Sequence, residues 1–548
     1  MSDSFYITTP IYYVNDRPHI GHVYTTTIAD VIARYHRLRG DDVFFLTGTD
    51  EHAAKVVESA TKHGVSAQEW ADKNAAEFEN TFKRLKFTNN DFIRTSQERH
   101  KERVKQYVKA LLDSGDVYLG DYEGWYDAGQ EEYVPENKAK ENEYKSAISG
   151  RPLVRRKEKN YFFRLSSYRD ALLTLLEKGE AVDGCKFDVQ PTARKNEIIE
   201  RIRTAEDIPI SRDVAGSGLG DWCIKVPGDD THAIYVWIDA LFNYLTTVDT
   251  DDRRKYWQAG AVHLIAKDIL WFHAAIWPAL LLALRKCKGY EWVNLPRLVY
   301  SHSFWISEGR KMSKSEGNFI DLEKLDQYIG TFSLDALRYF LASNGPLGTT
   351  DSDFAEAKFV EVYNAKLANS LGNCFSRVSN MIGRYFDGRL PKRGPRPELP
   401  SGELEWLVTA YSGDDEAIRG AANSYQRIQL HDAVGFAIEL VQRTDTYIEI
   451  TSPFKLAKDA AKLPIVGTIL LDCAECLRIA SLLLWPVIPE KCEELWRRIG
   501  CDYAAQLDAN GGRGKLDEWV KWGQLKEGTL LEKGDALFPR YQPPKDAK

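Results

Sequence analysis

Residues 5–47 read FYITTPIYYVNDRPHIGHVYTTTIADVIARYHRLRGDDVFFLT and decide the fold of the first part of the chain. The apolar stretch 5–9 predicts a strand, and the apolar residues of 23–38 recur largely on one side of a predicted helix. Gly40 ends this helix, and the apolar stretch 41–47 predicts a second, buried strand. A strand, a helix and a strand in this order predict a parallel sheet with a right-handed crossover.

A turn with two histidines, Pro18-His19-Ile20-Gly21-His22, joins the first strand to the helix. Its histidines are expected at the mouth of the helix, where free N–H groups and the helix dipole favour phosphate. The stretch Thr49-Asp50-Glu51-His52 follows the second strand. Because ligands bind at the carboxyl ends of parallel strands, we expect this stretch to lie beside the histidine turn.

A second motif, Gly309-Arg310-Lys311-Met312-Ser313-Lys314-Ser315, lies far along the chain on a polar segment. Its two lysines could close over the same phosphates. Either motif alone is ambiguous, since similar histidine turns occur in other nucleotidyl-transfer enzymes and basic loops are often solvated surface. The pair in this order favours an ATP site in which an acid attacks the α-phosphate. Such attack requires positioning and charge neutralisation but no covalent enzyme group.

The composition is that of an ordinary globular protein. The chain has 548 residues, of which 43% are apolar and 28% charged, so two to four domains are expected. No apolar run has the length of a transmembrane helix, and the N-terminus moves at once into a predicted strand. We therefore expect a cytoplasmic protein without a membrane partner. The net charge of −7 argues against indiscriminate binding to polyanions but leaves room for a local basic face.

The eight cysteines are scattered, and only Cys473 and Cys476 have metal-like spacing. Both lie in an apolar stretch that predicts a helix, without a second pair or a histidine nearby. Because a zinc site needs four ligands, we expect buried free thiols in a reducing compartment.

The pattern of the chain changes twice after the first α/β unit. Polar and glycine-rich stretches within 117–230 predict an insertion, after which strands are predicted at 233–238, 262–265 and 298–301. After about residue 353 only helical patterns remain. These patterns predict a split α/β sheet followed by a helical bundle.

Several further stretches point to one family. They are, in chain order, Ile7–Asn15, Gly48–His52, Asn160–Leu165, Ile210–Arg212, Tyr235–Leu241 and Lys267–His273. Together with the histidine and lysine motifs, they resemble the class I aminoacyl-tRNA synthetases. In detail, and along essentially the whole chain, they are similar to the methionyl-tRNA synthetase family.

The resemblance implies an ATP-dependent, AMP-forming ligase. Such an enzyme forms methionyl-adenylate and pyrophosphate from L-methionine and ATP, and then transfers methionine to the 3′-terminal adenosine of tRNA(Met), initiator tRNA included. Magnesium is implied with the ATP substrate. The chain stops without the tRNA-binding barrel that makes some relatives dimers, so we expect a monomer.

The resemblance also implies a split Rossmann-type parallel sheet with an inserted connective domain, followed by an all-α anticodon-binding bundle. The expected ranges are 1–116 for the first half of the catalytic domain, 117–230 for a connective insertion without a zinc knuckle, 231–325 for the second half with the lysine loop, 326–360 for a stem-contact linker, and 361–548 for the helical anticodon-binding domain.

By similarity, Asp50 binds the α-ammonium group of methionine, a role that suits a carboxylate at a strand end. The expected methionine site consists of Asp50 together with Ile11, Tyr13, Trp237, Ala240, Leu241, Tyr244, Ile269, Phe272 and His273. Aromatic side chains suit a polarizable sulfur, and a polar contact from Tyr13 or His273 could help to reject plain aliphatic side chains.

The ATP site is also assigned by similarity. It consists of His19, Gly21, His22, Lys311, Met312, Ser313, Lys314 and Ser315. Within this set, the expected catalytic residues are His19, His22, Lys311 and Lys314. For Gly21 we expect a backbone reason, because a side chain there would stand between the base and the turn.

The anticodon end is expected on the helical bundle. In the family, the residues that match Asn373 and Arg377 read the anticodon, and their spacing of four places them on one flank of a predicted helix. The third expected reader is a tryptophan after a proline, whereas this chain has Phe454 after Pro453. Phenylalanine can still stack on a base, with less area and without an N–H group.

Many relatives open a zinc knuckle with Cys-x-x-Cys soon after a Tyr-x-Gly-x-Tyr. Here Tyr122-Glu123-Gly124-Trp125-Tyr126 is followed by Asp127-Ala128-Gly129-Gln130, so the cysteines are missing. We therefore predict no structural zinc and no other metal site, that is, a zinc-free form of the family.

Three alternatives stay open at this point. Another class I synthetase is one, although the enzymes for leucine, isoleucine and valine need a larger editing insertion, and the cysteine enzyme needs zinc ligands. A catalytically idle, synthetase-like tRNA-binding protein is the second, but it should have lost His19, His22 or Lys314, which are all present. A small-metabolite nucleotidyltransferase, the third, would have no use for the helical last third.

Overall fold

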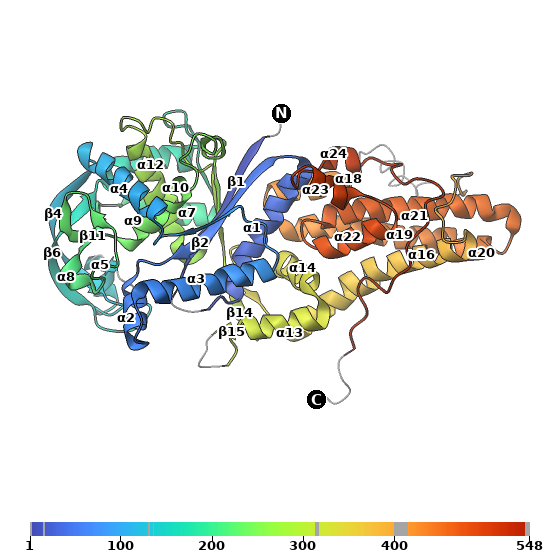
Figure 1. Cartoon of the computed structure of the whole chain (residues 1–548), viewed down its shortest axis with the longest axis horizontal. Coiled ribbons are helices and arrows are strands. Elements are labelled where there is room, and N and C mark those ends of the chain that lie inside the picture. The colour runs from blue at the N-terminus through green and yellow to red at the C-terminus, as the bar shows by residue number, and fades with distance from the viewer. Residues whose placement is uncertain are drawn as a thin grey trace.

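A six-stranded parallel sheet lies at the centre of the N-terminal part of the molecule (Figure 1). The computed structural model describes residues 3–14, 17–129, 132–134, 136–312, 317–398 and 415–542. In sheet order, the strands are β3 (Asp91–Arg94), β2 (Asp42–Asp50), β1 (Ser4–Tyr13), β12 (Val262–Ala266), β13 (Leu298–His302) and β7 (Asp188–Gln190). All neighbouring pairs are parallel, so the predicted parallel sheet is confirmed.

Side chains of the central strands alternate between two hydrophobic cores. In β1, Phe5 faces the core that contains α1 (Ile20–Arg39), whereas Tyr6 faces the opposite core. In β2, Phe45 and Phe44 divide in the same way. Because both faces are buried, these strands appear in the sequence as continuous apolar runs.

The first strand–helix–strand unit is formed as predicted, but its strands are longer than expected. Helix α1 ends at Gly40, whose φ of 100° lies in the left-handed region that favours glycine. Strands β1 and β2 continue to Tyr13 and Asp50, which are register partners. The added length brings two predicted methionine-site residues side by side.

Two antiparallel sheets lie in the range 117–234. One has the order β5 (Glu132–Val134), β4 (Val117–Asp127), β6 (Val154–Phe163), β8 (Ile208–Pro209), and the other has the order β10 (Lys225–Val226), β11 (Asp229–Ile234), β9 (Ser211–Asp213). Strand β7 lies in the same range of the chain, yet it pairs with β13 at the edge of the central sheet. The chain therefore returns to the central sheet once within the range expected for the insertion.

The prediction that residues 233–238 form a strand of the central sheet is wrong. The strands predicted at 262–265 and 298–301 are confirmed as β12 and β13. Residues up to Ile234 belong to β11, which pairs with β9, and α9 (Val236–Leu241) begins two residues later. A short apolar run such as YVWIDAL has no periodicity that separates a strand from a helix. The difference places Trp237 on a helix.

Helices cover both faces of the central sheet. The remaining ones in the α/β part are α2 (Ala54–Lys62), α3 (Ala67–Arg84), α4 (Glu98–Asp113), α5 (Glu136–Glu141), α6 (Arg169–Leu173), α7 (Thr192–Arg203), α8 (Val214–Ser217), α10 (Asn243–Thr246), α11 (Arg254–Gln258) and α12 (Trp277–Leu284), with the short segments η1 (Leu165–Tyr168), η2 (Thr174–Lys178), η3 (Lys267–Ile269) and η4 (Phe272–Ile276). Helices α4 and α12 contribute to the core opposite α1.

A small three-stranded sheet and two helices follow β13. The strands have the order β15 (Arg310–Lys311), β14 (Trp305–Ser307), β16 (Ser352–Asp353), and the helices are α13 (Leu322–Phe332) and α14 (Leu334–Asn344). The lysine motif therefore begins on a hairpin next to the last long strand of the central sheet.

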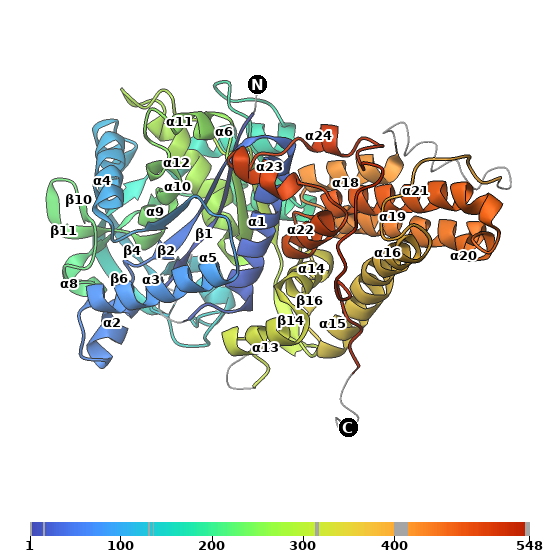
Figure 2. The same cartoon turned by 45° about the vertical axis from the view of Figure 1, so that its right-hand side comes forward.

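The C-terminal part is helical, as predicted (Figure 2). Its elements are α15 (Glu356–Val362), η6 (Tyr363–Gly372), α16 (Asn373–Tyr385), α18 (Glu416–Gln426), α19 (Leu430–Thr451), α20 (Pro453–Leu456), η7 (Ala460–Lys462), α21 (Leu463–Leu484), α22 (Pro489–Arg498), α23 (Tyr503–Ala509) and α24 (Leu516–Trp519). None of the helices that the structure describes is both long and apolar enough to cross a membrane.

The bundle packs directly on α1, the helix that follows the histidine turn. The ring of Tyr35 stacks on Tyr425 of α18 with centroids 4.6 Å apart. The buried Arg338 of α14 donates from Nη2 to Oδ2 of Asp30 on α1 (2.7 Å) and from Nε to the carbonyl oxygen of Val487 (2.9 Å). Through these contacts the bundle is fixed against the helix that carries the predicted phosphate site.

Candidate active site

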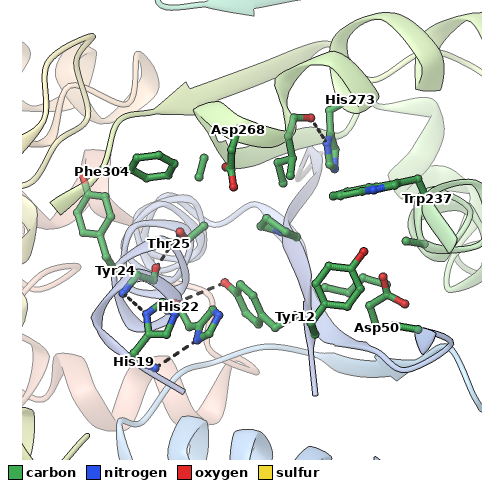
Figure 3. Close-up of a pocket in the computed structure, with 18 of the residues that line it drawn as sticks. Tyr12, His19, His22, Tyr24, Thr25, Asp50, Trp237, Asp268, His273 and Phe304 are labelled. Carbon is green, nitrogen blue, oxygen red and sulfur yellow. Dashed lines mark hydrogen bonds between the residues drawn. The ribbon is translucent and has the colours of Figure 1, made fainter. Parts of the chain in front are cut away.

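A cavity of about 690 Å³ opens at the carboxyl ends of β1, β2, β12 and β13, beside the N-terminus of α1 (Figure 3). This is the edge at which parallel sheets bind ligands. The predicted site residues that line it are Ile11, Tyr13, His19, Gly21, His22, Asp50, Trp237, Ala240, Leu241, Tyr244, Ile269 and His273. The predicted methionine site and the histidine part of the predicted ATP site therefore open into one space.

The two histidines of the turn cap α1 reciprocally. The N–H of Gly21 donates to Nδ1 of His19 (3.0 Å), and the N–H of His19 donates to Nδ1 of His22 (3.2 Å). Because each Nδ1 accepts a hydrogen bond, the proton of each neutral imidazole sits on Nε2. Burial, assisted by the neighbouring His19, lowers the pKa of His22 well below its usual range. The turn therefore presents Nε2–H donors at a helix N-terminus, where anions bind.

Gly21 is required by this cap. A Cβ atom at position 21 would lie 2.9 Å from Cε1 of His19, closer than carbon atoms pack. From the sequence, a side chain at position 21 was expected to conflict with a bound base, whereas the structure shows a conflict with the His19 ring. The glycine thus allows the imidazole to fold back over its own turn.

Only the first part of the lysine motif belongs to the described residues. Ser313, Lys314 and Ser315 lie outside the described residues. Lys311 is exposed on β15 and Met312 is half-buried, and neither is part of the cavity wall formed by the described residues.

The chain after the motif returns to the cavity. The N–H of Ile20 donates to the carbonyl oxygen of Ile320 (3.2 Å), His19 and Asp321 form a β-bridge, and the rings of Phe319 and His19 are 5.2 Å apart. Segments far apart in the sequence are therefore side by side at the end of the cavity where α1 begins.

Asp50 lies at the opposite end and is only 3% exposed. The two residues after it are each held by a partner. The carboxylate of Glu51 accepts two hydrogen bonds from Arg94 (2.7 and 3.0 Å), and Nδ1 of His52 lies 2.7 Å from Oδ2 of Asp239. The backbone that presents Asp50 is thus fixed from two sides.

An aromatic wall faces Asp50. The ring of Trp237 stacks on Phe272 at 4.0 Å with an interplanar angle of 9°, and Tyr13 meets the same indole edge-on at 6.3 Å. Phe272 backs Trp237 and is not among the described residues that line the cavity. The remaining predicted methionine-site residues on this wall are Ile11, Ala240, Leu241 and Ile269. An apolar, polarizable surface of this kind suits a thioether.

A buried tyrosine–histidine pair closes the apolar end. Nδ1 of His273 lies 3.0 Å from the carbonyl oxygen of Ile269 and must donate to it, so Nε2 accepts from the hydroxyl of Tyr244 at 2.8 Å. Burial lowers the pKa of His273 to about 4 and raises that of Tyr244 well above its usual value. Both nitrogens of His273 are therefore engaged, and the Tyr244 oxygen is the polar atom of this pair that can accept from a ligand.

The opposite rim of the cavity was not predicted from the sequence. There, Asp268 follows β12, and Figure 3 shows its carboxylate pointing into the cavity, whose walls desolvate it and raise its pKa. Phe304 follows β13 and is 39% exposed. Oδ1 of Asp351 accepts from the N–H of Phe304 (2.9 Å) and from Nζ of Lys267 (2.6 Å). The signal for Asp268 and Phe304 was their position two residues after buried parallel strands.

The predicted anticodon residues lie on the bundle, far along the chain from the cavity. Asn373 is exposed on α16, and Arg377 one turn later pairs with Asp445 (2.9 Å) and Glu449 (2.5 Å) of α19. Phe454 on α20 is 40% exposed. An exposed aromatic ring can stack on an unstacked base, and amide and guanidinium groups can form hydrogen bonds to its edges.

No group of three or more histidine, cysteine, aspartate or glutamate side chains in the described ranges is arranged to hold a metal ion. Where relatives have a Cys-x-x-Cys, Oδ1 of Asp127 accepts from the N–H of Gly129 (2.9 Å) in a turn, and Gln130 lies outside the described residues. Cys473 and Cys476 are buried free thiols on α21, and burial raises their pKa values.

Comparisons with known proteins agree on one family. The family model described as "tRNA synthetases class I (M)" matches residues 5–142 and 138–379. The methionine–tRNA ligase of Bacillus subtilis (strain 168) is 38% identical over 557 residues, covering 99% of this chain and 78% of the relative. That of Caldanaerobacter subterraneus subsp. tengcongensis is 39% identical over 561 residues, covering 100% and 80%.

The fold is similar to a solved structure as well. Mycobacterium tuberculosis methionyl-tRNA synthetase in complex with methionyl-adenylate superposes with a TM-score of 0.84 at 32% identity, covering 98% of this chain and 100% of that chain.

Proposed function

The chain belongs to the methionyl-tRNA synthetase family of class I tRNA synthetases, and we propose that it is a methionine–tRNA ligase. It activates L-methionine with ATP to methionyl-adenylate and pyrophosphate, and then transfers methionine to the 3′-terminal adenosine of tRNA(Met), initiator tRNA included. The observation that supports this most is the single cavity, which joins a phosphate-type helix N-terminus to a carboxylate and an aromatic wall.

In this proposal, methionine binds between Asp50 and the aromatic wall. The buried carboxylate of Asp50 accepts the α-ammonium group, and the thioether packs against Trp237. The Tyr244 oxygen, held by His273, faces the same end. With the ammonium and the thioether fixed at this end, the methionine carboxylate is directed toward the histidine turn.

ATP binds at the histidine turn in the proposed mechanism. An oxygen of the methionine carboxylate attacks the α-phosphorus, a new P–O bond forms, and the bond from the α-phosphorus to the bridging oxygen of pyrophosphate breaks. The Nε2–H groups of His19 and His22 stabilise charge that spreads over the phosphate oxygens. Lys311 and Lys314 neutralise the departing pyrophosphate, and Met312, Ser313 and Ser315 complete the segment that closes over it.

Magnesium enters this proposal with ATP. Its preferred ligands are oxygen atoms, and ATP phosphates supply them together with water. This fits the described side chains, which form no metal-binding group of their own. When bound, the ion neutralises phosphate charge, while the histidines and lysines position and stabilise the reacting groups.

The other assignments stay proposals of the same kind. Asn373, Arg377 and Phe454 read the anticodon of tRNA(Met), the insertion at 117–230 is zinc-free, and the chain is a monomer in the cytoplasm. The domain ranges 1–116, 117–230, 231–325, 326–360 and 361–548 are kept, with β7 as a strand that 117–230 contributes to the central sheet.

The decisive experiment is amino-acid-dependent ATP–pyrophosphate exchange without tRNA. We expect exchange with methionine and at most weak exchange with leucine, isoleucine, valine or cysteine. Faster exchange with one of these would establish another class I synthetase. Binding of tRNA(Met) without any exchange would establish the idle tRNA-binding alternative.

A further inference from the structure

A buried carboxylate behind the cavity is held between two imidazoles. Asp239 of α9 is 1% exposed. Its Oδ2 accepts from Nδ1 of His52 at 2.7 Å, and its Oδ1 accepts from Nε2 of His100 on α4 at 2.6 Å. Although burial alone would raise the pKa of Asp239, His52 and His100 lower it to about 2, so the group is ionised at neutral pH. None of the three residues lines the cavity.

The position of this trio connects the two sides of the amino-acid end. His52 stands two residues after Asp50, at the end of β2, and Asp239 stands two residues after Trp237, on the single helix α9. The hydrogen bond between them spans 187 positions of the chain and joins the two halves of the split sheet domain. It is a direct tie between the segment that presents the carboxylate and the segment that presents the indole.

The tie is costly to disturb. An ionised carboxylate in the protein interior is stable only when its oxygens accept hydrogen bonds. If His52 or Asp239 loses the other, the remaining buried polar group is unsatisfied, and the backbone around it shifts to reduce that cost. Helix α9 has only six residues and no side-chain N-cap, so its own hydrogen bonds fix it weakly. A shift of α9 would move Trp237, Ala240 and Leu241 relative to Asp50.

We propose that Asp239 is a positioning residue for methionine: through His52 it fixes the separation between the Asp50 carboxylate and the Trp237 ring. The inference rests on the proposed function, because it assumes that methionine binds between these two groups. It adds a role for a trio that does not touch the substrate.

The test compares variants of the full chain in the exchange assay, with separate KM values for methionine and ATP. Asp239→Asn can accept from only one imidazole and presents an N–H to the other. His52→Leu removes the donor, whereas His52→Asn places an amide N–H near the position of Nδ1. We expect Asp239→Asn and His52→Leu to raise KM for methionine at least about tenfold, with KM for ATP within about twofold. His52→Asn should restore most of the methionine KM.

A second buried aspartate provides the matched control. Asp249 is also 1% exposed and is also tied to α4, through the hydroxyl of Tyr107 at 2.9 Å, but it is not among the described residues that line the cavity. We expect Asp249→Asn to lower the melting temperature about as much as Asp239→Asn while leaving both KM values within about twofold.

The outcomes separate the inference from the proposed function. An equal rise in methionine KM for Asp249→Asn, or no rise for Asp239→Asn and His52→Leu, would overturn the positioning role. If Asp239→Asn does not fold, the His52→Leu and His52→Asn pair decides. Trp237→Ala tests the methionine site itself. If Trp237→Ala leaves the methionine KM unchanged, the proposed methionine site is wrong. If Trp237→Ala raises the methionine KM while Asp239→Asn has wild-type kinetics, only the positioning role of Asp239 is wrong.

Discussion

The hydroxyl of Tyr244 donates to Nε2 of His273 across 2.8 Å, at the apolar end of the cavity. The other ring nitrogen of His273, Nδ1, donates a hydrogen bond to the carbonyl oxygen of Ile269. The imidazole is therefore locked in one tautomer and one orientation. Because the pKa of His273 is lowered to about 4, this arrangement persists throughout the neutral range.

Replacing Tyr244 by Phe should both weaken methionine binding and destabilise the fold. The variant leaves Nε2 of His273 buried without a donor, which costs about 1–3 kcal/mol of unfolding free energy. It also frees the ring of His273, which lines the same end of the cavity, so methionine KM in the exchange assay should rise. Tyr300→Phe is the control, because its hydroxyl also bonds a buried carbonyl oxygen, that of Leu347 at 3.0 Å, but outside the cavity wall. Equal methionine KM values for the two variants would contradict the prediction.

Replacing Lys314 by Ala should slow adenylate formation without loss of methionine affinity. The lysine is expected to neutralise pyrophosphate in the transition state, a contribution of about 10²- to 10³-fold in rate. Methionine affinity, measured by equilibrium dialysis, should stay near the wild-type value. Lys324→Ala, at a half-buried lysine of α13 that pairs with Glu356, serves as the control. An exchange rate unchanged by Lys314→Ala would remove the proposed role.

The sequence predicted the parts of this molecule whose signals are local. Apolar runs identified β1, β2, β12 and β13, and the turn at 18–22 was predicted to form part of a binding site and does line the cavity. Local patterns could not separate α9 from a strand, because its apolar run is too short to show a period.

Contacts between distant segments left no local signal. Asp239 lies in the family stretch Tyr235–Leu241, but its partners lie 187 and 139 positions away, so its contacts could not be predicted. Asp351 accepts hydrogen bonds from Lys267 and from the N–H of Phe304 at the cavity rim, and this role could not be predicted for the same reason. Only the fold brings such residues to the site.

Replacing Phe454 by Ala should impair aminoacylation but leave the exchange reaction intact. Stacking of one base on an aromatic ring contributes about 1–3 kcal/mol, so kcat/KM for tRNA(Met) should fall about 5- to 150-fold. Phe454→Trp should match or exceed the wild type because the indole offers more area. Ile450→Ala, at a neighbouring apolar side chain that is also 40% exposed, is the control. A loss of the same size with Ile450→Ala would show that the surface as a whole, not the ring, is recognised.

Removal of metal ions should stop the ATP-dependent reaction but should not unfold the protein. Dialysis against a chelator should abolish exchange, and magnesium alone should restore it fully, because the insertion is predicted to need no zinc. Elemental analysis of the purified protein should find no stoichiometric zinc. Loss of folded structure after chelation, followed by circular dichroism, would contradict the zinc-free prediction.

The last prediction concerns the contact between α14 and the bundle. Asp335 of α14 is 1% exposed, and its Oδ2 accepts from the backbone N–H of Lys491 at the start of α22 (2.7 Å). Burial raises the pKa of Asp335 to about 7, well above the ordinary value of 3.8. Between these two pH values, the folded protein holds a proton that the unfolded chain has released.

The sign of the pH dependence follows from this difference. The stabilisation is complete below the unfolded pKa and is lost as pH rises through the folded pKa, by up to about 1.4 kcal/mol per pH unit. Asp335→Asn, which cannot ionise, should lack this loss, so its advantage in urea midpoint over the wild type should grow from pH 5 to about pH 7 and level off above that. Asp326→Asn, at an exposed carboxylate that pairs with Arg84, should show no such trend. Parallel pH curves for the wild type and Asp335→Asn would mean that Asp335 is ionised in the folded protein across this range.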